Sequence, residues 1–163
     1  YNFHGLTWDT WKTRIAGTKG KLALMEKAKK QGLIRHICCS FHDSPESLIK
    51  LADTGVFESI TVQYNMLDRS LEKAIRHCHD AGIGIVVMGP VGGGRLGVAS
   101  NRIKKMIGKD VRSTPEAALR FVLGSPYVDV ALSGMSNIQM LEENAVTVSR
   151  RNPLSRQDRK SVV

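Results

Sequence analysis

The residues best suited to chemistry in this sequence stand directly after short apolar runs. His4 follows "YNF", Ser40 ends "IRHICCS", and Gln63 ends "SITVQ" and is followed by Tyr64-Asn65. An imidazole donates a hydrogen bond to a carbonyl oxygen or takes part in proton transfer. A glutamine amide both donates and accepts hydrogen bonds. These side chains predict a site that holds a polar organic group.

Two glycine-rich segments predict that the same site holds an anion. "MGPVGGGRL" follows an apolar run at 83–87, and Gly134-Met135-Ser136 leads into a segment with helical spacing. Glycine lets the backbone approach a pyrophosphate closely, and Arg95 is a candidate charge partner. The free N–H groups at the start of a helix also favour an anion.

The elements that must position these residues alternate regularly along the chain. Apolar, β-branched runs are separated by segments with helical spacing, which is typical of parallel β/α units. Ser44-Pro45 and Thr114-Pro115 are expected to start helices, and Gly32, Gly55 and Gly82 to end them. The predicted strands lie in 1–3, 34–40, 59–65, 83–89 and 128–134, and the predicted helices in 21–32, 44–55, 70–82, 114–126 and 136–150.

Five parallel units fit either a doubly wound open sheet or part of a (β/α)8 barrel. A doubly wound sheet concentrates its site at one switch point. Here polar or glycine-rich groups follow every predicted strand, as they do around the top face of a barrel. We therefore predict an α/β fold, a partial (β/α)8 TIM barrel with parallel strands. Residues 95–113 are expected to be an insert containing a short basic helix.

Composition excludes several other classes of protein. The 163 residues include 42% hydrophobic residues, and no apolar run reaches the ~20 residues of a membrane span. The net charge is +9, but aromatic residues are 6% and do not interleave with the basic runs, so nucleic-acid binding is not expected. The three cysteines match no disulfide or metal spacing, which favours a reducing, cytoplasmic location.

Several ordered motifs resemble the aldo/keto reductase family, from residue 1 to about residue 149. The closest likeness is to barrel units four to eight of a bacterial subgroup that often carries a ferredoxin-like extension. The motifs are "FHGL", "GLIRHICCSFH", "VQYNMLDR", "IVVMGPVGGGRL" and "SGMSNIQMLEEN". The resemblance implies reversible reduction of a small carbonyl substrate by hydride from NADP(H), with NAD(H) not excluded.

The resemblance also implies a role for each site residue. His4 is the catalytic histidine that orients the substrate carbonyl, while Gln63 and Ser40 contact the nicotinamide carboxamide. Met140 stands where arginine or glutamine is usual, which weakens the expectation of NADP over NAD. No metal ligand is expected. The expected cofactor-binding residues are Ser40, Gln63, Met88, Gly89, Pro90, Val91, Gly93, Arg95, Gly134, Ser136, Glu143 and Asn144.

The family's catalytic aspartate, tyrosine and lysine belong to units one to three and have no counterpart here. We therefore expect residues 1–149 to be a partial barrel, a fragment that is inactive alone, followed by a loose basic tail at 150–163. Five strands cannot close a barrel, so self-association through open edges is also expected. The alternatives are a non-catalytic nucleotide-binding or assembly module and a structural remnant without a ligand.

Overall fold

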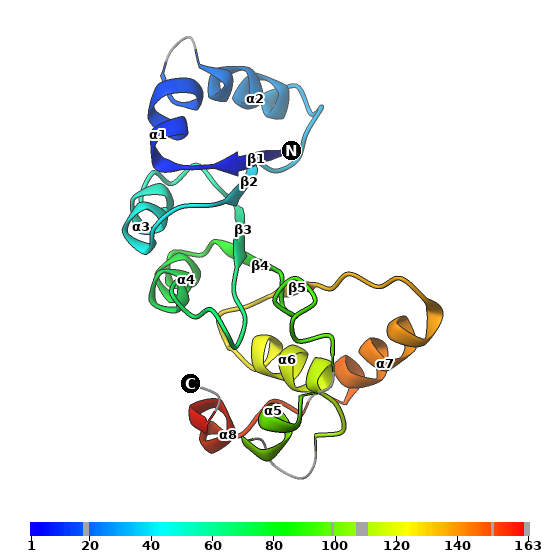
Figure 1. The fold of residues 1–163 in the computed structure, drawn as a ribbon. Helices are drawn as coiled ribbons and strands as arrows, with labels where there is room; N and C mark the ends of the chain where they lie inside the picture. The colour runs from blue at the N-terminus through cyan, green and yellow to red at the C-terminus, as the bar shows by residue number, and fades with distance from the viewer. Residues whose placement is uncertain (18–19, 99, 107–110, 151, 162–163) are drawn as a thin grey trace. The chain divides into compact units, whose positions relative to one another are not determined.

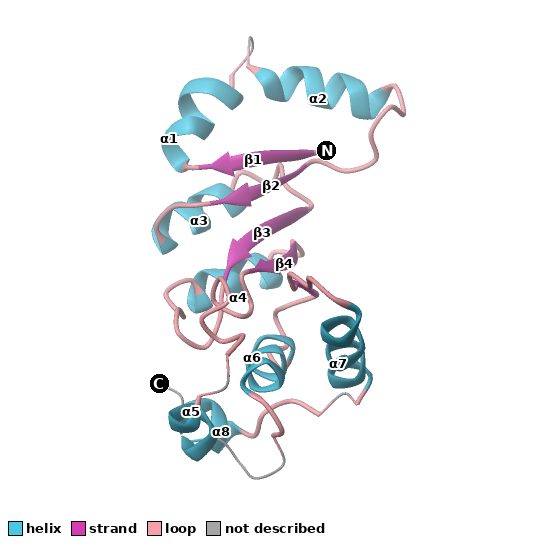
Figure 2. Cartoon of the chain, turned by 45° about the vertical axis from the view of Figure 1, so that its right-hand side comes forward, coloured by secondary structure: helices cyan, strands magenta, loops and turns pink. Residues whose placement is uncertain are grey.

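A computed structural model describes residues 1–17, 20–98, 100–106, 111–150 and 152–161. Its strands form one sheet in the order β1-β2-β3-β4-β5, and the β1–β2 and β2–β3 pairs are parallel (Figures 1 and 2). The predicted α/β fold with alternating strands and helices is confirmed. The strands are β1 (Asn2–Leu6), β2 (Cys38–Phe41), β3 (Ser59–Gln63), β4 (Gly84–Met88) and β5 (Val130–Leu132).

The helices between the strands begin and end largely where the sequence predicts. Ser44 caps α3 by accepting the backbone N–H of Ser47 at 3.2 Å. The cap of α6 is Ser113 rather than the expected Thr114, whose hydroxyl instead accepts the N–H of Ser100. The helices are α1 (Trp8–Thr10), the π-helix η1 (Trp11–Ile15), α2 (Lys21–Lys30), α3 (Pro45–Ala52), α4 (Glu72–Asp80), α5 (Asn101–Met106), α6 (Thr114–Leu123), α7 (Ile138–Ser149) and α8 (Arg156–Ser161).

The chain divides into two compact units. Unit 1 contains residues 1–62 and 71–86, and unit 2 contains residues 63–70 and 87–163. In unit 1, apolar side chains of β1, β2 and β3 and of one face of α3 and α4 fill the core. In unit 2, α6 is buried along most of its length, whereas β5 has no buried residue. No described helix is long and apolar enough to cross a membrane.

Unit 1 has an aromatic cluster that the sequence analysis did not anticipate. The segment after β1 forms α1 and η1, and η1 buries Trp11 against Phe57, with ring centroids 5.3 Å apart. Phe3 of β1 meets the same Phe57 ring edge-on at 6.4 Å. Edge-to-face pairs add to the stabilisation that burial of the rings provides. The helical turns after β1 thereby hold the strand that carries His4.

In unit 2, the C-terminal segment is more ordered than expected. Residues 156–161 form α8, and Arg159 of this helix donates to the carbonyl oxygen of Phe121 and stacks over its ring at 4.4 Å. Leu154 is buried. The expectation of a loose tail was wrong because arginine and leucine contacts, rather than apolar periodicity, anchor the segment. Residues 151 and 162–163 lie outside the described part of the chain.

The insert after β4 matches its expected form, since residues 101–106 form α5. Residues 99 and 107–110 of this insert lie outside the described residues. Unit 2 also exposes large apolar side chains on β5 and α7. They are Val130, Leu132, Ile138, Leu141, Val146 and Val148. Self-association remains a prediction.

Glu58 makes the stability of unit 1 depend on pH. Its carboxylate accepts from Lys29 Nζ and pairs with Nδ1 of His36 at 2.7 Å, and these partners lower its pKa from 4.5 to about 2. A depressed pKa in the folded state stabilises the fold above the unfolded value and loses this effect as pH falls toward 2. We expect the difference in urea midpoint between the wild type and Glu58→Gln to shrink as pH falls below about 4.5. A difference that stays constant down to pH about 2 would contradict this assignment.

Candidate functional site

In unit 1, a β-bulge in β1 presents His4. Phe3 pairs with Cys39 and Leu6 with Phe41, so three steps along β1 oppose two steps along β2. Gly5 absorbs the irregularity with φ +65°, a conformation that glycine adopts without strain. A bulge of this kind re-aims the side chain beside it. His4 is exposed at this point.

Ser40 of β2 closes the gap that the bulge leaves in the strand pairing. Its Oγ accepts the backbone N–H of Gly5 at 2.8 Å and lies 3.2 Å from Nδ1 of His4. Ser40 is buried, with 5% of its surface exposed. The structure therefore brings together two predicted site residues, His4 and Ser40.

The cysteines beside Ser40 are suited to packing rather than to nucleophilic chemistry. Cys39 and Cys78 are fully buried. Desolvation raises the pKa of the Cys39 thiol far above its ordinary value and that of Cys78 to about 11. A buried thiol that stays protonated is a poor nucleophile. Cys39 and Cys78 are therefore core residues, whereas Cys38 is half-buried.

In unit 2, Asn65 ties the end of β3 to the end of β4. Its Nδ2 donates to the carbonyl oxygen of Gly89 at 3.1 Å, and its Oδ1 accepts the N–H groups of Leu67 and Asp68 at 2.9 and 3.0 Å. Asn65 is completely buried. The exposed Gln63 lies beside Gly89, whose Cβ, if it had one, would be 4.0 Å from Cγ of Gln63.

A cavity of about 330 Å³ opens beside Gly89. Glycines form one wall, and a β-carbon at Gly93 or Gly134 would meet no heavy atom within 4 Å. The backbone can therefore come close to a ligand. The predicted site residues that line this cavity are Gly89, Pro90, Val91, Gly93, Gly134, Glu143 and Asn144.

Other predicted cofactor residues of unit 2 do not line this cavity. Met88 is half-buried at the end of β4, and the Ser136 hydroxyl lies 3.4 Å from the sulfur of Met140. The Arg95 guanidinium donates through Nε to the carbonyl oxygen of Gly92 at 3.1 Å. Residues 89–97 form the glycine loop, and most of its N–H groups donate to carbonyl oxygens of the same loop. The loop thus offers close backbone approach more than a set of free donors.

Glu143 and Asn144 are held in place on α7. Gln139 Nε2 donates to Oε1 of Glu143 at 2.9 Å, and Asn144 Nδ2 donates to Oγ of Ser133 at 3.2 Å. These contacts leave Oε2 of Glu143 and the amide oxygen of Asn144 as acceptors for a ligand, which suits a heterocycle that carries N–H donors.

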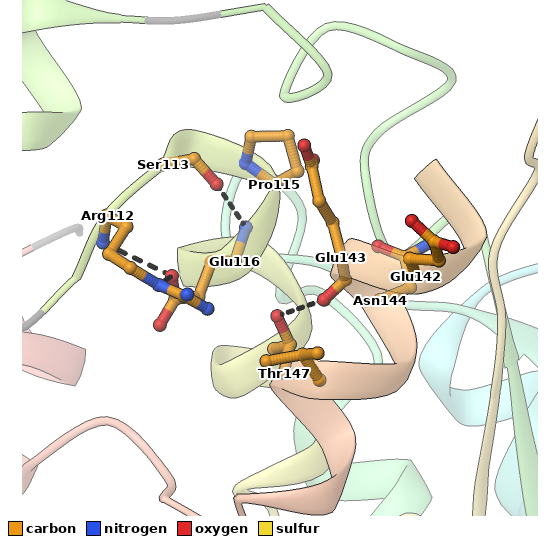
Figure 3. A pocket seen from close by; sticks show the side chains of 9 residues that line it. Arg112, Ser113, Pro115, Glu116, Glu142, Glu143, Asn144 and Thr147 are labelled. Atoms are coloured by element: carbon orange, nitrogen blue, oxygen red, sulfur yellow. Dashed lines mark hydrogen bonds and ion pairs between the residues drawn. The ribbon is translucent and has the colours of Figure 1, made fainter. Parts of the chain in front are cut away.

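A neighbouring cavity of about 300 Å³ was not anticipated from the sequence (Figure 3). It shares Pro115, Glu143 and Asn144 with the first cavity. Figure 3 shows Glu143 extending beside Pro115. The arrangement depends on the side-by-side packing of α6 and α7, for which the sequence carries no local signal. Its other lining residues are Arg112, Ser113, Glu116, Glu142, Val146 and Thr147.

Glu116 is the buried ionic centre of this second cavity. Its carboxylate accepts from Nε of Arg112 at 2.9 Å, and Arg120 Nη1 lies 3.6 Å away (Figure 3 shows the first contact). Glu116 and Arg120 are both 6% exposed. A buried charge is tolerated when it is paired and hydrogen-bonded. Within the described residues, no group of three or more His, Cys, Asp or Glu is placed to hold a metal ion.

Comparison with known families gives a match over most of the chain. The model of the aldo/keto reductase family matches residues 8–162. An uncharacterized oxidoreductase of Schizosaccharomyces pombe is 33% identical over 129 residues, which cover 77% of this chain and 41% of that protein. The chain therefore spans less than half the length of this curated relative.

Solved structures show the same fold. The aldo-keto reductase AKR11C1 from Bacillus halodurans, in its holo form, matches with a TM-score of 0.79 and 25% identity. The match covers 99% of this chain and 56% of that one. The aldose reductase from Giardia lamblia has a TM-score of 0.63 and 17% identity over 86% of this chain and 47% of its own.

Proposed function

This chain belongs to the aldo/keto reductase family, and on that premise we propose that it supplies the nicotinamide-dinucleotide site and the carbonyl-orienting histidine of an enzyme that reduces a small carbonyl compound to an alcohol. The observation that carries the proposal is the convergence of loop and helix residues on one cavity. Residues 89–91 and 93–94, residue 134 and residues 143–144 come from three separate segments and line the same 330 Å³ space.

The lining of the cavity supports a phosphate-bearing ligand. Its glycine wall admits a pyrophosphate without a clash with a β-carbon, and Glu143 and Asn144 present acceptor oxygens to the N–H donors of a base. The terminal nitrogens of Arg95 provide a cation close to the glycine loop. Bound there, the dinucleotide would supply the hydride for reduction.

The remaining roles fall to strand-end side chains. Gln63 binds the nicotinamide carboxamide, because its exposed amide can donate and accept at once. Met88 packs its thioether against the flat ring. Ser136 adds a hydroxyl at the start of α7. His4 donates a hydrogen bond to the substrate carbonyl oxygen and so makes the carbonyl carbon more susceptible to hydride.

The proposed cofactor is NADP(H), with NAD(H) bound almost as tightly. Strong preference for NADP(H) over NAD(H) requires a cationic side chain at the 2′-phosphate. Met140 is neutral, and Glu143 is the one charged residue among those described around the cavity. Arg112, beside the neighbouring cavity, is already paired with Glu116. We expect the two affinities to differ by less than about tenfold.

A second candidate function is a nucleotide-holding module without catalysis. It is favoured by the cavity itself, whose glycine wall and Glu143-Asn144 pair need no catalytic group to hold a dinucleotide. We propose that the 163 residues alone bind dinucleotide with little turnover and that turnover requires the aspartate, tyrosine and lysine that the family resemblance implies. We also propose a cytoplasmic location, since all three cysteines are free thiols.

Titration of the reduced dinucleotides tests the proposal directly. NADH and NADPH are fluorescent, so binding to the purified chain can be followed without turnover. We expect saturable binding, and we expect Gly134→Phe to weaken it at least about tenfold, because the new ring fills the cavity. Gly134 has open space around it and needs no left-handed backbone, so the substitution should not strain the fold.

Ser149→Phe is the matched control. It adds the same ring at an exposed position on α7 that lines neither cavity. Its affinity for both dinucleotides should equal that of the wild type. Absence of binding by the folded wild-type chain, or equal loss in both variants, would overturn the proposed site.

A further inference from the structure

We propose that Ser40 is a positioning residue that fixes the proton of neutral His4 on Nε2. This tautomer assignment follows from the geometry of the bulge at His4 and Gly5. Its consequence for catalysis rests on the proposed carbonyl reduction. Resemblance to the family implies a different role for Ser40, contact with the nicotinamide carboxamide. The structure indicates a second role for the same Ser40 hydroxyl.

The hydrogen bonds around Ser40 decide which way its proton points. The Oγ atom already accepts the N–H of Gly5 at 2.8 Å. Ser40 is 5% exposed, so water is a poor alternative partner for its hydroxyl hydrogen. Among the described residues, Nδ1 of His4 at 3.2 Å is the acceptor within reach. The hydroxyl therefore donates to Nδ1, which must be unprotonated.

The opposite tautomer would leave a buried group without a partner. With a proton on Nδ1, the Ser40 oxygen would have to accept both from His4 and from Gly5, and its own hydrogen would point into the packed interior. A buried donor without a partner carries its full desolvation cost. We expect the Nε2–H form to exceed the Nδ1–H form by at least about tenfold.

The fixed tautomer suits the proposed reaction. Nδ1, on one edge of the exposed imidazole, is hydrogen-bonded to Ser40 of β2. The Nε2–H on the opposite edge can then donate to a carbonyl oxygen. The bulge sets the direction of the ring, and Ser40 sets its donor atom. The second lone pair of Oγ stays open for an amide N–H, so this role is compatible with a carboxamide contact.

Nitrogen NMR of the histidine side chains tests this inference without any cofactor. Proton–nitrogen correlations of the ¹⁵N-labelled full chain distinguish the two tautomers of each of the five histidines. Disappearance of one set of signals in His4→Gln assigns His4. Above pH about 8, where an ordinary histidine is neutral, we expect a protonated Nε2 and an unprotonated Nδ1 for His4.

Substitutions at Ser40 then test the cause. Ser40→Ala should raise the fraction of the Nδ1–H form several-fold, Ser40→Thr should keep the wild-type ratio, and Ser59→Ala on β3 is the matched control. A predominant Nδ1–H form in the wild type overturns the inference even if no variant folds. An unchanged ratio in a folded Ser40→Ala chain also overturns it. Failure of dinucleotide binding would instead remove the proposed function and leave the tautomer assignment standing.

Discussion

Glu116→Ala is expected to lower the free energy of unfolding by about 3 kcal/mol, because it removes one partner of a buried ion pair. Arg120 would keep its hydrogen bonds to the carbonyl oxygens of Asn152 and Pro153, which places the loss at the lower end of the usual range. The Arg112 side chain is exposed and would be hydrated by solvent once Glu116 is removed. Urea unfolding followed by circular dichroism measures the change as a shift of the midpoint.

Glu142→Ala provides the matched comparison for this experiment. It removes the same charge from the lining of the same cavity, but Glu142 is exposed on α7. Its unfolding free energy should stay within about 0.5 kcal/mol of the wild type. Similar effects of the two substitutions would show that the ion pair at Glu116 contributes no more than a surface charge.

Asn65→Ala is expected to lower the free energy of unfolding by about 3 kcal/mol, since it removes the side-chain hydrogen bonds to three part-buried backbone groups. These groups are the carbonyl of Gly89 and the N–H groups of Leu67 and Asp68. Release of Gly89 should also weaken dinucleotide binding, because Gly89 lines the cavity. The variant therefore combines a lower urea midpoint with a higher dissociation constant.

Asn2→Ala is the control, because Asn2 is an exposed residue of β1. It should change neither the free energy of unfolding nor the free energy of dinucleotide binding by more than about 0.5 kcal/mol. If Asn65→Ala lowers stability but leaves the dissociation constant unchanged, Gly89 does not depend on Asn65 for its position.

The alternation of strands and helices could be predicted from the sequence because each element has a local signal. Glycines with positive φ at 32, 55 and 82 end helices, and Ser44 with Pro45 starts one. The glycine-rich segments after β4 and at Gly134 could be placed on the same edge of the sheet because both follow strand ends. Parallel strands bring such positions to the same edge of a sheet.

The features that sequence reasoning missed depend on contacts between segments far apart in the chain. Trp11 is buried by Phe57, and Arg159 is held by Phe121 and Tyr64. The bond from Ser40 to His4 joins residues on different strands, and the bulge that permits it depends on strand register. Residue types and local spacing carry no information about any of these pairs.

Pro115, Glu143 and Asn144 line both cavities of unit 2, and this shared lining bears on ligand design. Each cavity has the volume of a small-molecule pocket. Two weak fragments, one in each cavity, would both lie against Glu143 and would report on each other in a screen. A short linker over Pro115 would make the second contact intramolecular, so the joined compound would bind far more tightly than either fragment.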